Sequence, residues 1–436
     1  MAYGGGNWNV PIQNKVLSGT YVAFSSKARA TNIFGERGFV ACGLNLGFGV
    51  EDDLITIEPS DLQRDALRLF GVEYTDISLK PLRELLAHAK TAYIYRLNGG
   101  GVKANATVES GLTLTAKHSG TTANNFTVII TKNVDVEEKF DVTIKIGTLK
   151  AYEKTVSNVS ELSDNPYIDF KGKLVATVGT KLQNGTDGKE TTKSHTDFLE
   201  KLERKYVNVV AYAGTEQDVK RLYKSYVERR VNLEGAYFQV ALHDFEANSE
   251  LVINVKSNAK EDKSALVYWV AGIEAGCEIN KSVGNMLYDG EYSVELNMKQ
   301  RDLITAIKKG YFVFHEVDNK PRVLQDINSF TDFSISKNED FSKNQIIRVL
   351  HQVANDISTI FTRYLEKEQN NTLGRTMLWN DIYSHAIKLQ GLGAIQDLEP
   401  KDIKVELGDS KEAVYCEYLI NPVMAMSKLY MNVIVE

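Results

Sequence analysis

Cysteine is scarce in this sequence. Only three cysteines occur among its 436 residues, Cys42, Cys277 and Cys416, and they are widely separated along the chain. No two of them have the short spacing of a metal-binding knuckle or a redox motif. We therefore expect three small hydrophobic side chains, buried in a protein that is kept in a reducing compartment.

Long apolar runs and a strong net charge are missing as well. The longest uncharged apolar stretch, 265–273, is much shorter than the roughly 20 residues that cross a bilayer, and the first residues lack the pattern of a secretion signal. The 51 basic residues are nearly balanced by 57 acidic ones, which leaves a net charge of -6. This balance creates no electrostatic attraction to nucleic acid or to an anionic membrane. We expect a cytoplasmic protein with no direct nucleic-acid partner and no membrane insertion.

Motifs that carry chemistry are also missing, because the sequence has no phosphate-binding glycine loop, nucleophile elbow, paired-histidine zinc motif or EF-hand loop. The best candidate for an acid–base pair is His243 with Asp244, at the end of a predicted strand, where α/β sheets often carry sites. A half-buried histidine beside a solvated aspartate explains the same residues and is the commoner case. The sequence thus predicts no catalytic residue, cofactor or metal ligand. A hydrolase with an α/β catalytic layer and a β accessory domain is the alternative.

Alternating strands and helices fill two stretches, 26–101 and 188–340. In the first stretch, two apolar strands flank two helices, and the first helix begins near Ser60, whose hydroxyl can cap a helix. Strands separated by helices of this length are typical of a layered α/β domain. In the second stretch we expect helices at 195–206, 217–231, 264–276 and 299–309, and strands at 207–213, 237–243, 251–255 and 311–317.

The segment between them, 102–187, has a different pattern. Apolar residues alternate with polar ones at Leu112, Leu114 and Ala116, and the same alternation returns in 126–130 and 140–146. This period of two is typical of strands with one buried face. We expect an antiparallel β-sandwich that interrupts the α/β domain, and hence a mixed α+β and α/β multidomain fold.

Residues 341–428 form a further unit of helices and strands. Apolar residues recur every three or four positions in 346–364 and again in 378–389. This spacing predicts two amphipathic helices, each with one apolar side. The alternating residues Val414, Cys416, Tyr418 and Ile420 then predict a strand.

Both ends of the chain have the pattern of apolar strands without a partner nearby in the sequence. These segments are 1–25 and 429–436. An apolar strand does not stay bare in water, because its amides and side chains pair with another edge. Either the two strands pair within the chain or they complete the sheet of a neighbouring molecule. In the second case, a head-to-tail link propagates into a ring or a helix.

Several runs resemble those of contractile phage tail sheath proteins, in particular the short sheaths of Gram-positive myophages, defective prophages and phage-tail-like R-type bacteriocins. The resemblance covers the whole chain and rests on the order and spacing of the runs together. One departure is Ser18, where relatives often have a proline that would fix the backbone of the first arm. The matching runs are QNKVLSGTYV at 13–22, GERG at 35–38, the segment 341–361 with ANDI at 354–357, the segment 371–395 with GR at 374–375, INPV at 420–423 and LYM at 429–431.

This resemblance implies a structural subunit that is not an enzyme. Sheath subunits of this family stack as hexameric rings around an inner tail tube, exchange terminal strands with their neighbours, and contract to drive the tube through a target cell envelope. The resemblance also implies baseplate and collar or terminator proteins as partners. Assembly would take place in the bacterial cytoplasm, and the product would be a phage tail or a tail-like bacteriocin particle. The α/β layer resembles a subtilisin-like sheath domain, without the Asp, His and Ser motifs of a protease.

Carried onto this chain, the resemblance assigns roles to particular residues. The N-terminal arm, 1–25, and the C-terminal arm, 429–436, would donate strands to a receiving sheet near 414–420. The contact residues would be Val16, Leu17, Tyr21, Val22 and Phe24 in the first arm, Leu429, Met431, Val433 and Val435 in the second, and Val414, Cys416, Tyr418 and Ile420 in the receiving strand. The long helix from about Ser342 faces the tube in relatives, so Lys343, Arg348, Arg363 and Lys367 are candidates for contact with an acidic tube wall. An ordinary solvated helix face explains these four residues nearly as well.

Overall fold

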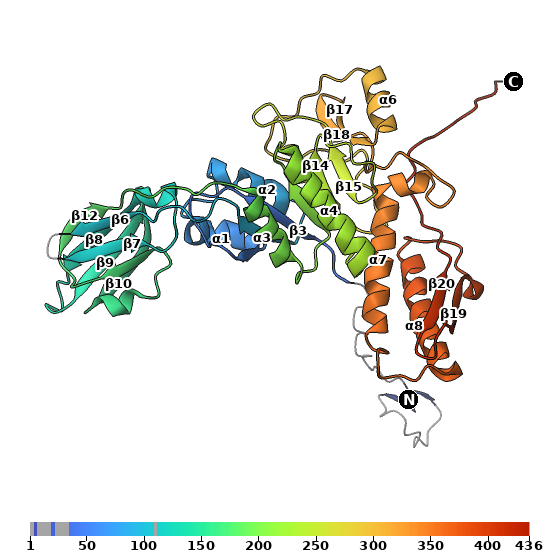
Figure 1. Cartoon of the computed structure of the whole chain (residues 1–436), viewed down its shortest axis with the longest axis horizontal. Helices are drawn as coiled ribbons and strands as arrows, with labels where there is room; N and C mark the ends of the chain where they lie inside the picture. The colour runs from blue at the N-terminus through green and yellow to red at the C-terminus, as the bar shows by residue number, and fades with distance from the viewer. Residues whose placement is uncertain (1–3, 7–18, 22–34, 109–110, 436) are drawn as a thin grey trace.

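The computed structural model of this chain describes residues 4–6, 19–21, 35–108 and 111–435. Figure 1 shows a β domain at one end, a layered α/β body in the centre, and two helices with a small sheet at the other end. The predicted class, a mixed α/β fold of several units, is confirmed.

A seven-stranded sheet forms the centre of the body, in the order β16-β15-β14-β13-β3-β5-β4. Its neighbouring strands are parallel except at one edge, where β4 (Leu54–Ile57) pairs antiparallel with β5 (Thr91–Arg96). Parallel strands of this kind are buried on both faces, which explains their nearly continuous apolar sequences. The other strands are β3 (Phe39–Leu44), β13 (Val209–Tyr212), β14 (Gln239–His243), β15 (Val252–Val255) and β16 (Tyr311–Phe312).

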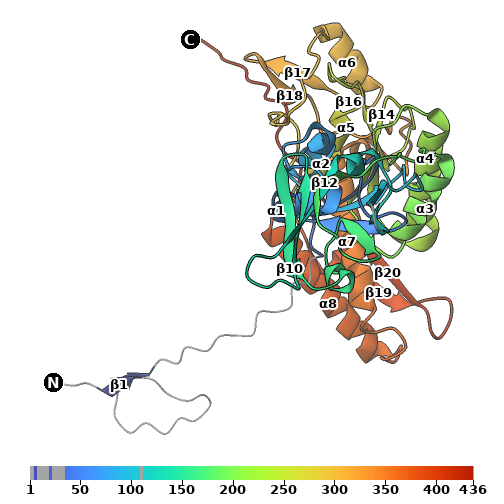
Figure 2. The ribbon, with the colours of Figure 1, turned by 90° about the vertical axis from the view of Figure 1, so that its left-hand side faces the viewer.

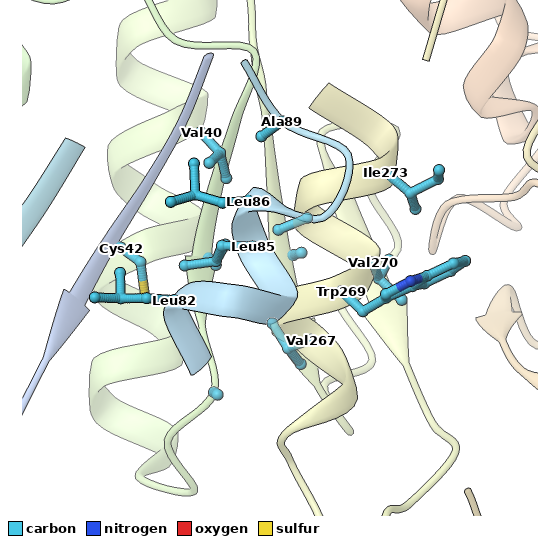
Figure 3. Packing of buried hydrophobic residues seen from close by; sticks show 14 of the residues in the cluster. Val40, Cys42, Leu82, Leu85, Leu86, Ala89, Val267, Trp269, Val270 and Ile273 are labelled. Atoms are coloured by element: carbon cyan, nitrogen blue, oxygen red, sulfur yellow. The ribbon is translucent and has the colours of Figure 1, made fainter. Parts of the chain in front are cut away.

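Helices cover both faces of this sheet. One apolar core lies under α1 (Pro59–Phe70), α2 (Lys80–Leu86) and α5 (Leu266–Gly276), and the other lies under α3 (Thr192–Leu202) and α4 (Gln217–Glu234). Figure 3 shows α2 crossing close to α5, with Leu82 and Leu86 near Cys42 and Val40 of β3. Gly272 permits this approach, because a Cβ there would lie 2.3 Å from the Leu85 carbonyl oxygen.

The start of α1 differs from the prediction. Ser60 is not the N-cap, because the helix begins at Pro59 and the cap position is occupied by Glu58, two residues before Ser60. The Asp61 carboxylate accepts a hydrogen bond from the Glu58 amide at 3.3 Å. Proline suits the first helical position, since the amide that it lacks would have no partner there.

Two antiparallel sheets form the β domain, and one apolar core fills the space between them. The expected strands are present, and the burial of β7 (Leu112–Ala116) alternates as its sequence predicts. The first sheet contains β6 (Asn105–Val108), β7 and β11 (Ile168–Lys171), and the second contains β8 (Phe126–Lys132), β9 (Phe140–Ile146), β10 (Leu149–Val156) and β12 (Thr177–Lys181).

A helix and a β-hairpin lie between α5 and the last unit of the chain. The helix α6 (Gln300–Lys308) precedes β16, and the strands β17 (Phe314–Val317) and β18 (Lys320–Val323) form an antiparallel hairpin.

The last unit contains α7 (Asn344–Phe361), α8 (Thr372–Gly391) and the hairpin of β19 (Ile403–Leu407) and β20 (Val414–Tyr418). The two predicted helices are present, and apolar residues of both share a core that includes Val353 and Ile382. Only α7 is clearly amphipathic, because α8 also exposes Leu373 and Ile387. The strand expected at 429–435 does not form within the chain, since the structure gives these described residues no strand. Figures 1 and 2 show this segment running away from the body.

Candidate functional site

The hairpin of β19 and β20 is a two-stranded sheet that lies on α8. Its register pairs Ile403 with Tyr418 and Val405 with Cys416, so these four side chains share one face. The Trp379 indole of α8 donates a hydrogen bond to the Ile403 carbonyl oxygen at 2.7 Å. The hairpin is therefore fixed on its helix, and among the residues that the structure describes no further strand pairs with either of its edges.

A hollow lies beside each strand of the hairpin. The first, of about 490 Å³, lies between α8 and β19 and is lined by residues that include Trp379, Val405 and Leu407. The second, of about 440 Å³, lies between the end of α7 and the start of β20 and includes Phe361, Leu365 and Val414. Apolar side chains line both hollows, but only the first runs along a strand, because the second reaches the hairpin at Val414 and the turn before it.

The C-terminal segment, residues 423–435, has apolar side chains that are exposed to solvent. The exposed fraction is 86% for Leu429, 74% for Met431, 71% for Val433 and 90% for Val435. A run of large apolar residues with this exposure marks a surface that another molecule covers.

The C-terminal segment leaves the body at residues 423–425. Gln345, in the first turn of α7, donates from Nε2 to the Val423 carbonyl oxygen, and its Oε1 accepts from the Ala425 amide, each at 3.1 Å. The next residue, Met426, is fully exposed. Gln345 thus marks the point at which this segment separates from the body.

The backbone of Gly35 is also bonded to α7. Its amide donates to Asp356 Oδ1 at 2.8 Å, and its carbonyl oxygen accepts from Gln352 Nε2 at 3.2 Å. Both partners are buried residues of α7. Asp356 Oδ2 also lies 2.9 Å from His385 Nε2 of α8.

Of the predicted N-terminal contact residues, Tyr21 is described. Val16, Leu17, Val22 and Phe24 lie outside the described residues. The backbone of Tyr21 ends β2 (Gly19–Tyr21), which pairs in parallel with β1 (Gly4–Gly6). In the receiving strand, Val414, Cys416 and Tyr418 belong to β20, whereas Ile420 follows it.

Arg348 is buried inside the subunit and does not face a tube wall, contrary to what the resemblance implied. Its side chain is 2% exposed, and its guanidinium pairs with Glu274 of α5 and, at 2.8 Å, with Asp326. Burial and the neighbouring Asp326 charge raise the pKa of Glu274, whereas the Arg348 charge opposes burial and leaves the pKa of Asp326 lowered. This network joins α7 to the α/β body.

The other three basic candidates remain at the surface. Arg363 and Lys367 are exposed, and Lys343 is partly covered with its amine 3.9 Å from Glu339. Reasoning from sequence missed Glu274 and Asp326 as partners of Arg348. One signal was present, because Glu274 is the only charged residue in the apolar helix α5.

The acid–base candidate does not form a catalytic pair. His243 Nε2 lies 3.1 Å from Asn258 Oδ1, and burial lowers the pKa of His243. Asp244 instead pairs with Lys256. Among the described residues, no group of acidic, histidine and cysteine side chains could hold a metal ion, and no helix is long and apolar enough to span a bilayer.

Three family models match successive parts of the chain. They describe the phage tail sheath protein beta-sandwich domain at 99–187, the phage tail sheath protein central domain at 188–329 and the phage tail sheath C-terminal domain at 336–436. The phage-like element PBSX protein XkdK of Bacillus subtilis is 28% identical over 97% of both chains.

Two crystal structures of sheath tail proteins are similar to this chain over most of its length. The protein from Desulfitobacterium hafniense is 34% identical, with a TM-score of 0.82 over 95% of this chain and 99% of that one. The protein from Listeria innocua is 29% identical, with a TM-score of 0.79 over 90% of this chain and 93% of that one. The chain therefore belongs to the phage tail sheath protein family and is a structural protein of a contractile tail sheath.

Proposed function

We propose that this chain polymerises into helically stacked hexameric rings around an inner tail tube, and that neighbouring subunits are linked by exchanged terminal strands. The observation that carries the proposal is the C-terminal segment, whose apolar side chains have no cover within the described chain. Contraction of the sheath would drive the tube through a target cell envelope. Baseplate and collar or terminator proteins would bind the two ends of the assembly.

The hairpin of β19 and β20 is the proposed receiving sheet. An incoming strand at either open edge would satisfy the unpaired amides and carbonyl groups there. Side chains on one face of that strand would enter the adjoining hollow beside α7 or α8. The alternating residues Leu429, Met431, Val433 and Val435 supply such a face, and Val16, Leu17, Tyr21, Val22 and Phe24 would contribute the contacts of the N-terminal arm.

Strand exchange suits a sheath because it keeps neighbours joined while the subunit bodies move. Burial of each large apolar side chain contributes about 1.5–3 kcal/mol, so one arm supplies a strong link. An extended lattice held in this way can be metastable and contract when new contacts between subunits form. No nucleotide or other cofactor is needed for this mechanism, and we propose that the chain is not an enzyme.

Other parts of the chain have proposed places in the sheath. The seven-stranded layer corresponds to the subtilisin-like sheath domain, and the β domain lies on the outside. Lys343, Arg363 and Lys367 are proposed to face the tube. Arg348 is removed from this set, because its charge is already paired in the interior. Assembly is proposed to occur in the bacterial cytoplasm, before release as part of a phage tail or bacteriocin particle.

The decisive experiment replaces Leu429, Met431, Val433 and Val435 with threonine. Threonine keeps the preference for a strand but removes most of the apolar surface. We expect a folded chain that forms no tubes in electron micrographs, under conditions in which the native chain forms them. The matched control replaces Val134 and Val178, exposed apolar residues of the β domain, with threonine. Normal tubes from the four-residue variant would contradict the proposal.

A further inference from the structure

One side of α7 carries four polar residues that are almost completely buried. Gln345, Arg348, Gln352 and Asp356 are spaced at three, four and four positions, which places them on one side of a helix. Each is between 1% and 3% exposed. We call this set the polar stripe of α7.

The first member of the polar stripe holds the C-terminal segment in the way that a neighbouring strand would. The Gln345 amide group donates to the Val423 carbonyl oxygen and accepts from the amide two residues later. A residue in a parallel β-ladder makes the same pair of bonds to its partner strand. Gln345 therefore fixes the backbone on both sides of residue 424, at the point where the segment leaves the body.

The last two members hold the other end of the body in a similar way. Both backbone groups of Gly35 are bonded to α7, the amide to Asp356 and the carbonyl oxygen to Gln352. A Cβ at position 35 would lie 3.3 Å from Gln352 Nε2 and 3.4 Å from Asp356 Oδ1. The fit around this glycine is thus close on two sides.

Arg348 lies between these contacts and fixes the helix itself. It forms ion pairs with Glu274 and Asp326. Asn344 binds to the same cluster, because its Nδ2 donates a hydrogen bond to Glu274 Oε1 at 3.1 Å. Burial of such charged groups costs desolvation energy, and apolar residues of similar volume often give equal or greater stability. A gain in stability therefore does not by itself explain a polar stripe at this place.

We propose that Gln345 is a positioning residue for strand exchange, which fixes where the C-terminal arm leaves the subunit. This inference rests on the proposed function. The same helix holds Gly35 through Gln352 and Asp356, so the exit of the C-terminal arm keeps a constant position relative to Gly35 while the body moves. Arg348 maintains this arrangement by holding α7 against the α/β body.

The test uses the full chain with Gln345 replaced by leucine, which keeps the approximate volume but removes both hydrogen bonds. We expect the hydrogen of the Ala425 amide to exchange with solvent at least about tenfold faster. The loss of each hydrogen bond shifts the equilibrium between the bound and the released segment severalfold towards release. We also expect the concentration needed for tube formation to rise by about tenfold. Gln300→Leu is the matched control, since Gln300 is an exposed glutamine at the start of α6.

A second variant, Ala425→Pro, removes the amide that bonds to Gln345 and leaves α7 unchanged. If Gln345→Leu fails to fold, this variant tests the positioning role of Gln345 in its place. The positioning role is wrong if the folded variants form tubes at the same protein concentration as the native chain. It is also wrong if the Ala425 amide of Gln345→Leu exchanges with solvent at the native rate. If the four-residue threonine variant of the C-terminal arm also forms tubes normally, strand exchange itself is wrong, and the two failures can be distinguished.

Discussion

Asp326 Oδ2 lies 2.8 Å from a guanidinium nitrogen of Arg348, and both side chains are almost completely withdrawn from solvent. Arg348 belongs to α7, whereas Asp326 precedes that helix, in the segment that follows the β17–β18 hairpin. The ion pair therefore sets the position at which the last unit of the chain packs on the α/β body.

Removal of this arginine should destabilise the protein strongly. Arg348→Met would leave the carboxylates of Glu274 and Asp326 buried without a positive partner, which costs about 3–5 kcal/mol. Urea denaturation of the monomer measures the change in the free energy of unfolding. Arg363→Met, at an exposed position of the following turn, should change it by no more than about 0.5 kcal/mol. Equal effects of the two variants would disprove the structural role of Arg348.

Acid should destabilise the folded chain through His351. Burial, and to a smaller degree the charge of Arg37, lowers the pKa of His351 from 6.5 to about 3. Between these values the unfolded chain binds a proton that the folded chain does not, so the free energy of unfolding falls as pH falls. The slope reaches about 1.4 kcal/mol per pH unit. His351→Gln should reduce this slope in denaturation curves between pH 6.5 and 4, and an unchanged slope would contradict the prediction.

Two glycines should respond in opposite ways to alanine. A Cβ at Gly272 would lie 2.3 Å from the Leu85 carbonyl oxygen, so Gly272→Ala must push α2 away from α5. We expect a loss of about 1–3 kcal/mol, typical of an overpacked core. A Cβ at Gly391 would have no described atom within 4 Å. Gly391→Ala should therefore be neutral or stabilise by up to about 1 kcal/mol, and thermal unfolding of both variants checks the difference.

Deletion of residues 1–24 should leave a folded body that does not polymerise. The described contacts of Gly35 and the central sheet remain in this truncated chain. Circular dichroism tests the fold, and electron microscopy tests for tubes. Tubes of normal length from the truncated chain would show that the N-terminal arm is not a link between subunits.

Local sequence patterns predicted most elements, because periodicity depends on neighbours along the chain. The alternation of Leu112, Leu114 and Ala116 recurs in the burial of β7, and the apolar spacing of α8 recurs in its contact with α7. Helix ends were predicted less well. Serine is a favourable N-cap residue, but Ser60 does not cap α1, because Pro59 and Asp61 together favour an earlier start of the helix.

By itself, the sequence determined the order of helices and strands, since this follows from local apolar patterns, but it left open whether the C-terminal strand pairs within the chain or with a neighbour. Only the tertiary structure decided the role of Arg348, which looked like any solvated cation of an amphipathic helix. Its side chain is buried because the fold brings it to Glu274, which lies 74 positions earlier, and to Asp326. The same holds for Gln345, Gln352 and Asp356, whose partners at the two ends of the chain are distant in sequence. Burial of a polar side chain is decided by which partners the fold brings to it, and a local pattern contains no record of them.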